Sequence, residues 1–256
     1  MKPAPFILVS ALLFSPGILA AEERVLVLDN PESSYLPVTH ADWYRDLTAE
    51  QSLEDVLRLP EGEWQASKKD RMNLGVERAA VWLRFRVRNA SDTTEWLLVG
   101  EDGRLEEFSY AMLDTAGEPV QRGAGGTLRP MSQREIKSRL QIFPLSPRPD
   151  EEYIVYLRVR TASRALIAFR LETRPVFYGH EFLDLQINTA YYALLLTVIV
   201  ANVVLALRTG STLPWLYIVV ISSAGLYQYT LSGYLYALLS PETPFWIWFN
   251  RHAGMM

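Results

Sequence analysis

Two segments alternate aromatic and arginine side chains with apolar residues, and these are the residues whose types and spacing suit binding chemistry. Residues 81–88 read VWLRFRVR, and residues 153–160 read YIVYLRVR. The period of two of a β-strand gives each segment one apolar face and one face of aromatic and arginine side chains. The candidate ligand-binding residues on the second face are Trp82, Arg84, Arg86, Tyr156 and Arg158.

If the two strands lie in one sheet, this face could bind a sugar. Aromatic rings stack on the apolar faces of a pyranose, and guanidinium groups donate to hydroxyls or to the carboxylates of acidic glycans. In the alternative interpretation the face is solvated, and its arginines pair with Glu106, Glu107 or Glu172 across strands. Alternation alone favours this alternative for the complete set, and Trp82 can equally be a core residue if both sides of its strand are buried.

The sequence contains no pattern typical of catalysis or metal binding. The chain has no cysteine, and His40, His180 and His252 do not have metal-ligand spacing. No Gly-x-Ser-x-Gly motif or activated nucleophile is evident, and the glycine-rich residues 123–126 are interpreted as a turn because no Lys-Ser/Thr pair follows them. We therefore predict no enzyme activity, no cofactor and no metal site.

The elements that must position the candidate residues are β-strands. Between residues 25 and 176 apolar residues recur with period two in short runs separated by turn residues, which is typical of an antiparallel sandwich. An amphipathic helix is expected at residues 49–59, with Thr48 as its cap. Further strands are expected at residues 95–99, 105–113, 139–143 and 165–171.

Charge is distributed very unevenly along the chain. Asp, Glu, Lys and Arg are absent from residues 185–207 and from residues 209–240, and each stretch is long enough to cross a bilayer. The predicted divisions are a signal peptide (1–21), an extracytoplasmic β-sandwich (22–176), a juxtamembrane linker (177–186), transmembrane helices (187–207 and 213–239), and an extracytoplasmic tail or lead-in to a third helix (240–256).

Orientation follows from the turn between the two helices. Arg208 places that turn in the cytoplasm, so the sandwich and the C-terminal residues lie outside. Too few residues then face the cytoplasm to form an output enzyme. The net charge of −4 gives no reason to expect a nucleic-acid partner.

The sequence resembles the bacterial seven-transmembrane receptors with diverse intracellular signalling modules that carry the type 2 extracellular domain. The resemblance rests on residues 81–87 with Asn89, the turn at 114–117, Gly123, the segments 143–145 and 156–159, and, in the helices, Tyr191-Tyr192, Asn202, residues 215–217 and Gly233. It implies a jelly-roll sandwich similar to carbohydrate-binding modules, seven helices, and a cytoplasmic kinase or cyclase output. On this resemblance the chain would be truncated after the second helix.

The predicted function is a membrane-anchored sensory input module that binds a carbohydrate-like or other extracytoplasmic ligand and passes the signal to a transmembrane bundle. The predicted location is the bacterial inner membrane, with the sandwich in the periplasm or outside the cell. Expected partners are the lipid bilayer, a glycan or small molecule, and a signalling kinase or cyclase. The alternative is a membrane-anchored periplasmic subunit that binds a protein partner.

Overall fold

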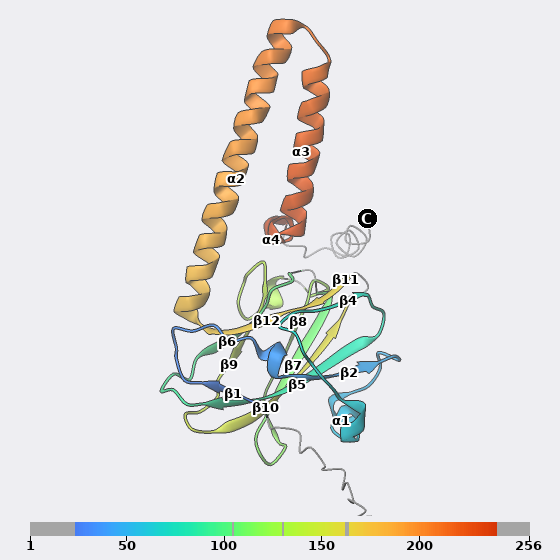
Figure 1. The fold of residues 1–256 in the computed structure, drawn as a ribbon, viewed down its shortest axis with the longest axis vertical. Coiled ribbons are helices and arrows are strands. Elements are labelled where there is room, and N and C mark those ends of the chain that lie inside the picture. The colour runs from blue at the N-terminus through green and yellow to red at the C-terminus, as the bar shows by residue number, and fades with distance from the viewer. Residues whose placement is uncertain (1–23, 104, 130, 162–163, 240–256) are drawn as a thin grey trace, which may run out of the picture.

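The described part of the protein has one large and two small β-sheets, and a helical hairpin projects from one end of them (Figure 1). The computed structural model describes residues 24–239 except residues 104, 130, 162 and 163. Mainly antiparallel sheets occupy residues 25–173 and a long apolar helix follows, as the sequence predicts. The expected signal peptide and the segment 240–256 lie outside the described residues.

The larger sheet is built around two long central strands. Its strand order is β3 (Gln65–Ala66), β2 (Asp42–Asp46), β5 (Ala80–Asn89), β10 (Glu152–Arg160), β7 (Glu107–Leu113) and β8 (Pro119–Gly125). β1 (Val25–Leu28) pairs with the end of β5 and is parallel to it. The two predicted arginine-bearing strands are β5 and β10, and they are antiparallel neighbours, with Arg84 opposite Tyr156 and Trp82 opposite Arg158.

Two smaller sheets complete the β-rich part. One has the order β12 (Phe169–Thr173), β6 (Trp96–Gly100) and β9 (Gln141–Leu145), and the other pairs β11 (Arg164–Ile167) with β4 (Met72–Val76). The single strand expected at residues 165–171 is divided at Ala168, whose carbonyl leaves the ladder and accepts a hydrogen bond from the amide of Glu101 at 3.0 Å. Short 3₁₀ helices occur at η1 (Pro37–His40), η2 (Glu61–Glu63) and η3 (Met131–Gln133).

Both faces of the larger sheet are covered. Its inner face packs against the three-stranded sheet, so that Leu83 and Leu157 share one core with Leu98 and Phe169. Its outer face has a second cluster formed by Val56, Trp64, Trp82, Ala111, Leu113 and Tyr156. A third cluster lies on the other face of the three-stranded sheet, away from the core, where Phe177 of the first long helix covers Leu97 and Ile142.

The helix over the outer face is shorter than predicted. α1 spans Leu53–Val56, and its cap is Ser52, which exchanges hydrogen bonds with Asp55 in a capping box. The expected cap, Thr48, instead belongs to a turn in which the buried Asp46 carboxylate accepts hydrogen bonds from the backbone amides of Thr48 and Ala49. Ala49 has a positive φ of 56°, so the helix cannot start there.

The glycine-rich residues 123–126 also differ from the prediction, because residues 123–125 are in strand β8 and not in a turn. A Cβ on Gly123 would lie 2.3 Å from the ring of Tyr110, and one on Gly125 would lie 2.7 Å from the ring of Phe143. Both rings are buried, and the Tyr110 hydroxyl donates to the carbonyl of Pro144 at 3.0 Å. The glycines therefore make room for two core aromatic rings.

Up to residue 239, where the description of the structure ends, three helices follow the sandwich. α2 (Arg174–Thr209) and α3 (Leu213–Leu231) are antiparallel, and α4 (Tyr234–Leu239) lies at the foot of α3, near the sandwich (Figure 1). Residues 177–186, expected as a linker, are the first part of α2. The helix expected at 213–239 is divided at Gly233, where φ is 78°. Within the described residues α2 alone has the length and apolarity of a membrane-crossing helix. A membrane crossing by α3 therefore stays a prediction.

We predict that Gly123→Ala destabilises the protein by about 1–3 kcal/mol, because the added methyl group must displace a ring that is held by core packing and a hydrogen bond. Thermal unfolding followed by near-ultraviolet circular dichroism measures the change. Gly62→Ala is the matched control, since nothing lies within 4 Å of a Cβ at that position. Equal midpoints for the two variants would contradict the packing role of Gly123.

Candidate ligand groove

A groove of about 500 Å³ lies over strands β2, β5 and β10. Three of the five predicted site residues, Arg84, Arg86 and Tyr156, line it. Asp42 of β2 and Glu61 of η2 line it as well, so groups of both charges meet there. The alternating pattern of β5 and β10 directs the predicted residues to this side of the sheet because their apolar neighbours fill the core.

Arg84 contacts two carboxylates and an aromatic ring. Its guanidinium makes a two-pronged contact with the Glu61 carboxylate, with Nη1 2.9 Å from Oε1, and Nη2 is 3.4 Å from the Asp42 carboxylate. The guanidinium also lies over the ring of Trp64, 4.4 Å from its centroid. This combination of a bidentate carboxylate and an aromatic face is one that lysine cannot reproduce.

The two sides of this ion pair differ in exposure. The Arg84 side chain is 18% exposed, whereas the Glu61 side chain is 81% exposed. The hydrogen bonds from Arg84 lower the pKa of Glu61. Burial raises the pKa of Tyr156, the neighbour of Arg84 across the strands. The groove therefore has a fixed guanidinium beside a neutral phenol, and a solvent-facing carboxylate covers that guanidinium.

The other predicted residues are arranged differently. Arg86 forms an ion pair with Glu152 at 3.6 Å. Arg158 donates to the carbonyl of Ala49 at 2.7 Å and contacts Glu107 at 3.4 Å. Pairing of an arginine with Glu107, which the sequence offered as an alternative to sugar binding, is thus present in the structure.

Trp82 is a core residue. It is 4% exposed and packs in the cluster beneath α1, so it has no open ring face on which a sugar could stack. Trp82 and Arg158 border a second groove of about 420 Å³, which shares Tyr156 with the first. The five predicted residues are therefore divided between two adjacent grooves.

Sequence reasoning missed three residues that shape the first groove: Asp42, Glu61 and Trp64. They lie about 20 or more positions before Arg84 in the chain, in segments without a clear period, and pairing of β2 with β5 brings Asp42 directly opposite Arg84. The contact joins residues far apart in the chain, so no local sequence pattern predicts it. Within the described residues, no three His, Asp or Glu side chains are grouped as metal ligands.

A β-sandwich that leads directly into an apolar helix of spanning length is consistent with a membrane protein. Residues 39–173 match the family described as 7TMR-DISM extracellular 2, and the match covers more than half of the chain. The chain therefore belongs to this family, which confirms the resemblance seen in the sequence. The domain is a sensory, non-catalytic one. No curated protein matches the chain.

We predict that acid opens the Glu61–Arg84 contact. The folded-state pKa of Glu61 lies below the ordinary glutamate value of about 4.3, so the contact stabilises the fold fully above that value, and its contribution is lost as the pH falls through the folded-state pKa. Carboxyl chemical shifts measured by NMR follow the titration of Glu61.

In Arg84→Gln the Glu61 pKa should rise towards the ordinary value, because the charged guanidinium that donates to Glu61 is gone. Arg45→Gln removes an arginine of β2 that pairs with Glu77 instead, and should leave the titration of Glu61 unchanged. A Glu61 carboxyl that titrates identically in the Arg84→Gln variant and in the natural protein would refute the interaction.

Proposed function

We propose that this chain is the sensory input module of a bacterial signal-transduction receptor. In this proposal a carbohydrate-like ligand binds in the groove at Arg84, and the helices that follow the sandwich transmit the signal. The observation that supports it best is the membership of residues 39–173 in an extracellular sensor family, together with the groove that this domain carries.

The chemistry of the groove is suited to a polar ligand. Arg84 and Arg86 supply donors for hydroxyl or carboxylate oxygens, while Asp42 supplies an acceptor for hydroxyl groups. The exposed Glu61 carboxylate occupies the position on Arg84 that a ligand carboxylate would take. A sugar acid is therefore the ligand class that we propose, and it would replace Glu61 on the guanidinium.

Transmission is supported by the joint between the domains. β12 ends at Thr173 and α2 begins at Arg174, so a shift of the three-stranded sheet moves the helix without an intervening flexible segment. At about 1.5 Å per residue α2 is about 54 Å long, well beyond the ~30 Å hydrocarbon core, and its first turns therefore lie outside the membrane.

The rest of the predicted context belongs to the same proposal. Export by residues 1–21, insertion in the inner membrane with α3 as the second spanning helix, a jelly-roll connectivity, and coupling to a kinase or cyclase are consistent with a receptor of this family. The positive charge of Arg208 at the end of α2 would place the α2–α3 turn in the cytoplasm.

A glycan array that includes uronic and sialic acids, probed with the full chain in lipid nanodiscs, tests the ligand. We predict binding of an acidic sugar, which Arg84→Gln weakens roughly tenfold to a hundredfold, because a charge-assisted hydrogen bond is lost. Arg45→Gln is the control and should bind as the natural protein does.

Two results would refute the ligand assignment. One is a folded chain that binds no sugar, and the other is binding that is insensitive to Arg84→Gln. If cross-linking in cells then captured a periplasmic protein on the sandwich, the chain would be the interaction subunit that the sequence left as an alternative.

A further inference from the structure

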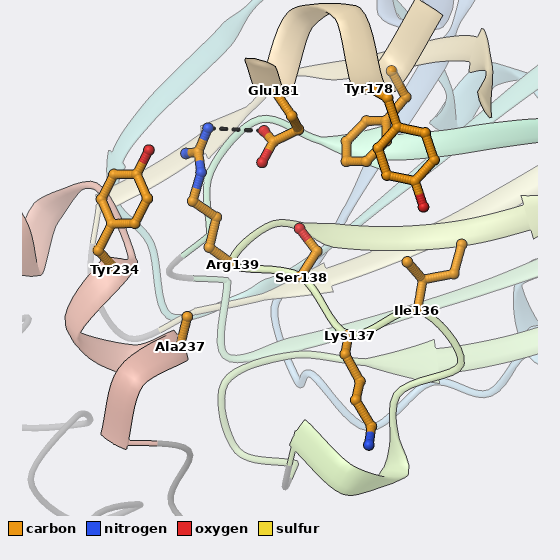
Figure 2. Close-up of a pocket in the computed structure, with 9 residues that line it drawn as sticks. Ile136, Lys137, Ser138, Arg139, Tyr178, Glu181, Tyr234 and Ala237 are labelled. Carbon is orange, nitrogen blue, oxygen red and sulfur yellow. Dashed lines mark hydrogen bonds and ion pairs between the residues drawn. The ribbon is translucent and has the colours of Figure 1, made fainter. Parts of the chain in front are cut away.

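The sandwich contacts the helical hairpin around a cavity of about 530 Å³, and Arg139 is one of the residues that line it (Figure 2). Arg139 belongs to the segment just before β9, while Glu181 of α2 and Tyr234 of α4 lie on either side of it (Figure 2). Its side chain is 13% exposed. One arginine of the sandwich thus reaches both arms of the hairpin.

On the α2 side, Arg139 contacts two carboxylates. Its Nη2 atom lies 2.8 Å from Oε1 of Glu181 and 2.8 Å from Oδ2 of Asp184. Burial raises the pKa of Glu181, although the positive charge of Arg139 acts in the opposite direction. Removal of either partner of a partly buried pair is costly, because it leaves a charge without compensation.

On the other side, Arg139 contacts the end of α3. Its Nη1 atom is 3.4 Å from the carbonyl oxygen of Ser232, the C-cap residue of that helix. Carbonyls at a helix C-terminus lack partners within the helix, and a cation there also interacts favourably with the helix dipole. The guanidinium is 5.1 Å from the ring centroid of Tyr234, and this ring stacks on Tyr229 of α3.

The turn itself is closely fitted to the same residue. Gly233 separates α3 from α4 with a φ of 78°, and a Cβ built on it would lie 3.5 Å from the backbone oxygen of Arg139. The backbone of Arg139 therefore lies close to the turn, and its side chain contacts Ser232 there. The positive φ at this position favours glycine and ends α3 at the level of the sandwich.

The two helices are not held to the sandwich in the same way. α2 is continuous with β12, buries Phe177 in the cluster beside the three-stranded sheet, and has an ion pair between Arg174 and Glu95 at 3.2 Å. His180 of α2 also lies 3.0 Å from the buried carboxylate of Glu172. Loss of Arg139 would remove its contacts with Glu181 and Asp184 but would leave all these other attachments of α2 in place. The end of α3 would lose the charged group that caps it.

We infer that Arg139 is a positioning residue that fixes the end of α3 against the sandwich, so that movement of the segment before β9 changes the position of α3 relative to α2. A role for this contact in signalling rests on the proposed sensory function. The contact itself does not depend on any ligand. Arg139 would thus give the sandwich a second connection to the membrane, beside the covalent joint at α2.

The chain contains no cysteine, so pairs of spin labels can be introduced without background. Glu118→Cys marks an exposed site on the sandwich, Phe182→Cys marks α2, and Tyr227→Cys marks α3. Double electron–electron resonance on the full chain in lipid nanodiscs, without added ligand, measures the distances from position 118 to positions 182 and 227.

We expect Arg139→Gln to shift and broaden the distances from 118 to 227 while those from 118 to 182 stay unchanged. Arg45→Gln, which removes an arginine on β2, should change neither distance. If Arg139→Gln lowers the yield of folded protein, Tyr234→Leu removes the ring beneath the guanidinium and should reproduce the selective shift.

Unchanged distances in both variants would overturn the inference. So would equal broadening of both distances, because Arg139 would then be a general stabiliser of the interface. No sugar enters the measurement, so a failure of the groove to bind glycans leaves this test unaffected, and a failure here leaves the glycan assay unaffected.

Discussion

The pairing of β5 with β10 is the interaction on which the rest of the structure depends. These two strands form the centre of the larger sheet, and β1, β2 and β7 all pair with one or the other. Their inner side chains, such as Leu83 and Leu157, fill the core between the sheets. Their outer side chains form the floor of both grooves. Because side chains alternate, one register fixes the core and the candidate site together.

Because both faces of this sheet are covered, the aromatic and arginine side chains on its outer face have different surroundings. Trp82 and Tyr156 take part in the outer apolar cluster, while the arginines beside them extend to carboxylates at its margin. Arg84 lies at the groove and pairs there with Glu61. Glu61 belongs to the short 3₁₀ helix η2, which only the tertiary fold brings near Arg84. The groove is thus formed where the outer cluster ends.

The three-stranded sheet is the part of the sandwich that adjoins the first long helix. α2 follows β12 without a turn and also packs on this sheet through Phe177. The end of α3 returns to the same region and meets Arg139. The sandwich is therefore connected to the two helices in different ways, by the continuous chain at α2 and by a polar contact at the end of α3.

The sequence by itself determined the elements whose signal is local. The period of two along residues 81–88 and 153–160 predicted β5 and β10, and the uncharged run after Leu185 predicted the apolar helix, because alternation and hydrophobic length follow from neighbouring residues. Only the tertiary structure decided that Trp82 is buried, that Gly123 and Gly125 belong to a strand, and that Glu61 and Trp64 surround Arg84. These features arise from contacts between segments distant in sequence, where burial and space depend on the arrangement of the sheets and leave no periodic pattern.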